Sequence, residues 1–90
     1  MLTFIVTFMF QKTRYQSRID RIASTPVSPT EYKAAFITPA FRTLPSAVFF
    51  IGDPVCKKLS FLSTPLSFGF ITEISNAIKV FCNKNNIRIY

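Results

Sequence analysis

The first 24 residues combine an apolar segment with a mixed one. Residues 1–10, MLTFIVTFMF, carry no charged side chain, and residues 11–24, QKTRYQSRIDRIAS, mix apolar with basic positions. Ten apolar residues are half of the roughly 20 that a membrane-spanning helix needs. Their β-branched and aromatic side chains suit a strand as well as a helix. The pattern therefore predicts that residues 1–10 pack against an apolar surface.

Two stripes of residues favour a helix for this segment. Within each stripe the residues recur at intervals of three, four or seven, so that on a helix each stripe forms one face. We expect one amphipathic helix over residues 1–24, followed by a proline-containing linker or turn at 25–30. The basic stripe consists of Arg14, Arg18 and Arg21, and the apolar stripe of Phe4, Phe8, Tyr15, Ile19 and Ile22.

The remainder of the chain, residues 31–90, contains one clear helical pattern. Four apolar residues between positions 71 and 82 recur at intervals of three and four, which predicts a helix. A capping box, opened by Ser28 and closed by Glu31, predicts a short helix that runs to Phe36. Short strands are expected at 46–51, 55–62 and 87–90, and the first two flank a turn signal at 52–54.

These patterns predict a mainly α protein. Its 90 residues form one small domain, with a long N-terminal helix, a C-terminal helix and short strands in the middle. An α+β arrangement is the alternative. Because the local signals across residues 37–70 disagree with one another, we expect a poorly packed fold.

The composition lacks the residues that most enzymes use. There is no His, and the four acidic residues are separated from one another by at least eleven positions. Two glycines cannot build a phosphate-binding loop, and two cysteines without His are too few for a structural zinc site. We therefore expect no enzyme activity, cofactor, metal site or small-molecule substrate. Cys56 and Cys82 have no functional setting in the sequence, and we expect them to be reduced, with a single disulfide between them as the alternative.

The charge points to an anionic partner. Eleven Lys and Arg against four Asp and Glu give a net charge of +7. An apolar segment followed by basic residues is typical of membrane-surface helices, whose apolar side chains enter the lipid while the basic ones meet anionic head groups. We expect membrane association, with mitochondrial or cytoplasmic location as the alternatives, since mitochondrial presequences are also basic and acid-poor. The predicted membrane contacts are Lys12, Arg14, Arg18, Arg21, Phe4, Phe8, Ile19 and Ile22.

A short motif supports a second partner, single-stranded nucleic acid. Residues 68–72, FGFIT, resemble the centre of the octapeptide of the RNA-recognition motif, and residues 49–52, FFIG, resemble its companion hexapeptide. In that family the alternating aromatic residues lie on a strand and stack on bases, so the resemblance implies Phe68 and Phe70 as nucleic-acid contacts. The sequence departs from the family pattern at Leu66, Ser67 and Glu73, where a basic residue, a glycine and an aromatic residue belong.

Residue usage supports a third hypothesis. Phe occurs eleven times, whereas Trp and His do not occur at all. Such usage differs from that of ordinary globular domains. The chain is therefore also compatible with a translated reading frame that has no selected function.

Overall fold

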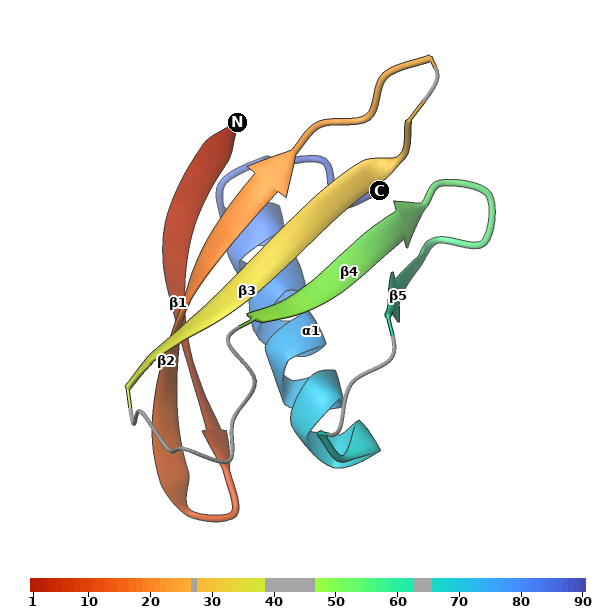
Figure 1. The fold of residues 1–90 in the computed structure, drawn as a ribbon. Coiled ribbons are helices and arrows are strands. Elements are labelled where there is room, and N and C mark those ends of the chain that lie inside the picture. The colour runs from red at the N-terminus through yellow and green to blue at the C-terminus, as the bar shows by residue number, and fades with distance from the viewer. Residues whose placement is uncertain (27, 39–46, 63–65) are drawn as a thin grey trace.

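The computed structural model of the chain is an antiparallel sheet with one helix packed on one of its faces (Figure 1). It describes every residue except 27, 39–46 and 63–65. The five strands lie in the sheet in the order in which they occur in the chain, and each is antiparallel to the next. The elements are β1 (Leu2–Phe10), β2 (Thr13–Ile22), β3 (Thr30–Thr38), β4 (Ala47–Asp53), β5 (Lys58–Phe61) and α1 (Phe68–Lys84).

The predicted mainly α fold with a long N-terminal helix is wrong. Residues 1–24 instead supply β1 and β2, which pair as a hairpin from Leu2 opposite Arg21 to Phe10 opposite Thr13. Gln11 and Lys12 join the two strands, with φ angles of 49° and 64°. Two successive positive φ values are typical of tight hairpin turns, where Gly and Asn are the usual residues. Because neither is present, this turn carries no recognisable sequence signal.

Residue spacing explains why the hairpin resembles a helix in the sequence. A spacing of four keeps two residues on one side of a helix and also on one side of a strand, whereas a spacing of three separates them on a strand. Arg14 and Arg18 accordingly share one face of β2, and Arg21 lies on the other. The apolar stripe divides in the same way: Phe4, Phe8, Tyr15 and Ile19 are buried, and Ile22 is exposed.

The short helix expected from Ser28 to Phe36 is also wrong, because these residues enter β3. β3 pairs with β2 on one side and with β4 on the other, and its alternate residues Tyr32 and Ala34 are fully buried. Pairing on both sides and burial outweigh a local capping signal. Three other expectations are confirmed in outline: β4 covers the described part of the strand expected at 46–51 and runs two residues further into the expected turn, β5 lies within 55–62, and α1 contains 71–82. Residue 46 is outside the described residues.

Aromatic rings dominate the core between α1 and the sheet. Ser67 caps the helix, since its Oγ accepts a hydrogen bond from the Phe70 backbone N–H over 3.3 Å. Phe70 itself is only 4% exposed. At the other end of the helix, Phe81 stacks on Phe4 with ring centroids 4.0 Å apart. The ring of Phe70 meets four others edge-on, with centroid distances of 5.5 Å to Phe8, 5.2 Å to Phe10, 4.9 Å to Tyr15 and 5.6 Å to Phe36.

We expect Phe70→Ala to lower the free energy of unfolding by about 3–5 kcal/mol, because it empties the centre of the aromatic cluster. Phe68 is the matched control: it is two residues away but 76% exposed. Phe68→Ala should change the free energy by less than about 0.5 kcal/mol. Urea unfolding followed by circular dichroism measures both. Equal effects of the two substitutions would contradict the central role of Phe70.

Candidate interaction surface

The sheet face opposite α1 is the candidate interaction surface. No other helix or strand among the described residues covers it (Figure 1). We call it the open face. Its side chains alternate along each strand with those that face α1, and pairing of the strands brings them into one surface. They are Thr3, Ile5, Thr7 and Met9 of β1; Arg14, Gln16, Arg18, Asp20 and Ile22 of β2; Glu31, Lys33 and Ala35 of β3; Ala47, Phe49, Ile51 and Asp53 of β4; and Lys58 and Ser60 of β5.

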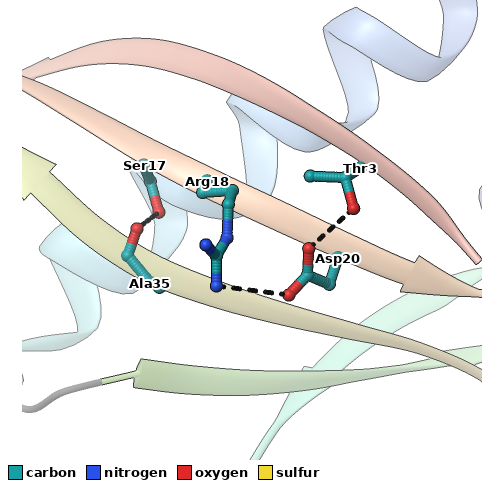
Figure 2. A network of polar contacts seen from close by, with 5 residues as sticks. All are labelled: Thr3, Ser17, Arg18, Asp20 and Ala35. Carbon is teal, nitrogen blue, oxygen red and sulfur yellow. Dashed lines mark hydrogen bonds and ion pairs between the residues drawn. The ribbon is translucent and has the colours of Figure 1, made fainter.

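A small polar network occupies the open face between β1 and β2 (Figure 2). Asp20 accepts a hydrogen bond from Thr3 Oγ1 over 2.9 Å and lies 3.7 Å from Arg18 Nη2. The Asp20 side chain is 15% exposed, whereas that of Arg18 is 52% exposed. On the covered side, buried Ser17 donates from Oγ to Ala35 O over 2.9 Å. The acid is therefore largely occupied by its neighbours, while the arginine keeps half of its surface available to a partner.

Basic residues outnumber acidic ones on and beside this face. Two arginines of β2 and one lysine of β3 project from it, and the turn between β1 and β2 adds a second lysine. Lys58 of β5 adds a fifth basic group, so five basic and three acidic side chains leave an excess of +2. The basic residues are Lys12, Arg14, Arg18, Lys33 and Lys58, and the acidic ones are Asp20, Glu31 and Asp53.

An apolar hollow of about 320 Å³ lies over β2, β3 and β4 on this face. Its volume is at the lower end of the roughly 300–1,000 Å³ that ligand sites occupy. Lys33 of β3 pairs directly with Phe49 of β4, so a basic group and an aromatic ring stand side by side. The main side chains that line the hollow are Ile22, Phe49, Ile51 and Leu62, with Glu31 and Lys33 between them.

The structure separates the residues predicted to contact a membrane. Phe4, Phe8 and Ile19 are buried in the core and cannot enter lipid while the chain is folded. Arg21 lies on the covered side of β2. Four of the predicted contacts remain on the surface near the open face, namely Lys12, Arg14, Arg18 and Ile22.

Sequence reasoning missed Lys33 and Phe49, which belong to the same surface. They are sixteen positions apart in the chain and become neighbours only through the pairing of β3 with β4. One sequence signal could have placed Lys33 on this face. It is the alternation of polar and apolar residues in β3, which can be interpreted only once β3 is identified as a strand.

The predicted nucleic-acid contacts lie elsewhere. Phe68 and Phe70 belong to the first turn of α1 and not to a strand. The ring of Phe70 lies inside the aromatic cluster, so it cannot stack on a base in the folded chain. Phe68 is exposed and lies near Phe61, with ring centroids 6.5 Å apart.

The residues after α1 are tied to the covered side of the sheet. The strand expected at 87–90 does not form. Arg21 instead donates from Nε to Arg88 O over 3.1 Å, and the Tyr32 hydroxyl donates to Ile89 O over 2.7 Å. Gly52 leaves room for this segment, because a Cβ atom at that position would lie 3.1 Å from Ile89 O. The third arginine of the predicted basic stripe thus has a structural role.

Both cysteines are free thiols. Cys82 is buried beside Tyr32, with 3.8 Å between its Sγ and the tyrosine hydroxyl oxygen, and burial raises the pKa of the Cys82 thiol. A buried protonated thiol is a poor nucleophile. Cys56 is exposed in the turn between β4 and β5. Within the described ranges, no three side chains of the types His, Cys, Asp and Glu gather into a metal-binding group.

Comparisons of the chain with protein-family models, curated proteins and solved structures give no match. In the described part of the chain, no helix has the length and apolar character to cross a membrane. We therefore infer function from the open face.

We expect the free energy of unfolding to fall as the pH rises from 10 to 12. Burial raises the pKa of Tyr32 from 10.0 to about 12, so the folded chain holds a proton that the unfolded chain releases. The stabilisation is complete below pH 10 and is lost as the pH approaches 12. Tyr32→Phe should flatten this dependence and also cost about 1 kcal/mol at neutral pH, because the hydrogen bond to Ile89 is lost. Urea unfolding at several pH values measures both effects. An unchanged slope in Tyr32→Phe would reject the assignment.

Proposed function

We propose that this protein is a non-enzymatic, peripheral membrane-binding protein that attaches to anionic lipid through the open face of its sheet. One observation carries the proposal: the open face combines large exposed apolar side chains with an excess of basic ones. The site differs from the predicted N-terminal helix, which does not form, and only four of the predicted contacts lie near it.

The apolar side chains supply the first part of the argument. Ile5, Met9, Ile22 and Phe49 each expose about half of their surface on this one face. Gathered exposed apolar residues mark protein or membrane interaction sites, whereas scattered ones are ordinary. Insertion into the boundary between lipid head groups and acyl chains removes these side chains from water.

The basic side chains supply the second part. Each Lys or Arg near an anionic membrane surface contributes about 1 kcal/mol. Arg14 and Lys33 are exposed on the open face, and Arg18 keeps half of its side chain exposed beside Asp20. The net charge of +7 also draws the whole chain towards such a surface.

The same face is less suited to single-stranded nucleic acid. Bases bind to sheets by stacking on aromatic rings, and two or three such rings are usual. Among the described residues of the open face, Phe49 is the one aromatic side chain. The other large apolar residues there are aliphatic or Met, which favours lipid.

We expect Arg14→Glu combined with Lys33→Glu to weaken binding to phosphatidylserine-containing vesicles at least about ten-fold, because two attractive charges become repulsive. Lys79→Glu combined with Arg88→Glu is the matched control, because it changes the net charge equally on the helix side of the molecule. Vesicle flotation with phosphatidylserine and with neutral phosphatidylcholine measures the difference. Equal losses in both double variants would show that only net charge matters and would reject the open face as the site.

We expect Ile22→Ser combined with Phe49→Ser to weaken vesicle binding about ten-fold, because two inserted apolar groups are lost. Val55→Ser combined with Phe68→Ser removes exposed apolar groups elsewhere and should leave binding unchanged. Fluorescence titration with single-stranded RNA accompanies each measurement. Tight RNA binding that depends on Phe49, without vesicle binding, would replace the proposal by nucleic-acid recognition, and binding to neither would reject it.

A further inference from the structure

The outer edge of β1 is unusual for the edge of a sheet. β1 spans nine residues without a charged side chain or a proline, and no described strand pairs with its outer side. Its alternate residues direct backbone N–H and C=O groups away from β2. Edge strands are commonly short or carry charge, which prevents pairing with another chain. β5, at the opposite edge, is short: it has four residues and begins at Lys58. The two edges therefore differ, and β1 is the one that can accept a further strand.

A row of residues on α1, which we call the α1 stripe, lies beside this edge of β1. A groove of about 410 Å³ runs between β1 and α1, and four residues of its helix side lie at intervals of four, three and four. Such residues share one face of a helix. Glu73 lies at one end of the stripe, Ala77 and Val80 occupy its middle, and Lys84 lies at the other end. Val80 is 65% exposed. Exposed apolar residues between opposite charges form a surface that can pack against a second helix.

The stripe is complementary to itself when one copy is turned around. If two such helices lie antiparallel about a two-fold axis, Glu73 of each faces Lys84 of the other, and Ala77 of each faces Val80 of the other. β1 obeys the same symmetry, because two copies of one edge strand related by a two-fold axis pair antiparallel. α1 packs against β1, so one axis serves both contacts. Closed two-fold interfaces of this kind use the same patch on both subunits.

We propose that two copies of the chain form a symmetric homodimer in which the β1 edges pair and the α1 stripes pack side by side. The two five-stranded sheets then form one continuous sheet with both helices on the same face. The net charge of +7 on each copy opposes association. Electrostatic repulsion is least at this interface, because β1 is uncharged and Glu73 of each copy pairs with Lys84 of the other. Both open faces point the same way. The dimer is independent of the proposed membrane binding.

The first test places a charge at the centre of the interface. Sedimentation velocity of the full chain over a range of concentrations should show a monomer–dimer equilibrium. Val80→Glu should abolish the dimer, because each copy would place a carboxylate against an apolar surface near the axis. Val55→Glu is the control: Val55 is 89% exposed in the turn between β4 and β5 and should leave the dimer intact. A wild-type chain that is monomeric at every concentration, or equal effects of both variants, would overturn the proposal.

The second test uses the charges at the ends of the stripe. Glu73→Lys and Lys84→Glu should each weaken the dimer about ten-fold, because two attractive pairs become repulsive. The double variant Glu73→Lys/Lys84→Glu should recover the wild-type dissociation constant, and a mixture of the two single variants should form a heterodimer. Circular dichroism verifies that each variant remains folded. Single variants as tightly dimeric as the wild type, or a double variant as weak as the singles, would overturn the antiparallel arrangement.

Discussion

The packing of α1 against one face of the sheet is the constraint on which the other features of this protein depend. Every strand of an antiparallel sheet directs alternate side chains to each face, so an apolar face is stable only where another element covers it. Phe70 brings the start of the helix into contact with rings from three strands, and Phe81, near the end of the helix, stacks on Phe4 near the start of β1. The position of the helix therefore decides which face is core and which is surface.

The open face follows from this constraint. A chain of 90 residues has one helix among its described elements, and it covers one side. The other side still carries aliphatic residues such as Ile5 and Ile22, which water solvates poorly. In the proposed binding mode, the membrane removes them from water and the neighbouring basic groups meet its negative charge. The apolar edge of β1 has the same need for a partner, which a second copy can supply.

A charged residue, Arg21, attaches the segment after α1 to the covered side of the sheet. Arg21 lies at the end of β2, where its guanidinium reaches the carbonyl of Arg88, and its charge centre lies 5.9 Å from the ring centroid of Tyr32. Tyr32 completes the attachment through Ile89 and lies beside the buried thiol of Cys82. The side chains of Arg21 and Tyr32 satisfy the carbonyls of Arg88 and Ile89 at this margin, which allows the chain to cross the edge of the core. Arg21, which the sequence pattern assigned to a basic surface, thus attaches the C-terminal segment to the end of β2.

The sequence by itself determined the C-terminal helix and the two short strands, because their signals are local: isoleucines from Ile71 to Ile78 repeat at helical spacing, and Pro54 begins the turn between β4 and β5. Only the tertiary structure decided the fate of residues 1–24. Their spacings of four fit a helix and a strand equally. The spacing of three between Arg18 and Arg21 predicts one helix face, but on β2 it places Arg21 on the covered side, where it donates to a carbonyl 67 positions away. The open face has the same origin, since Lys33 and Phe49 meet only through pairing of β3 with β4. Pairing between distant strands selects among local conformations of nearly equal energy, and no local pattern contains that information.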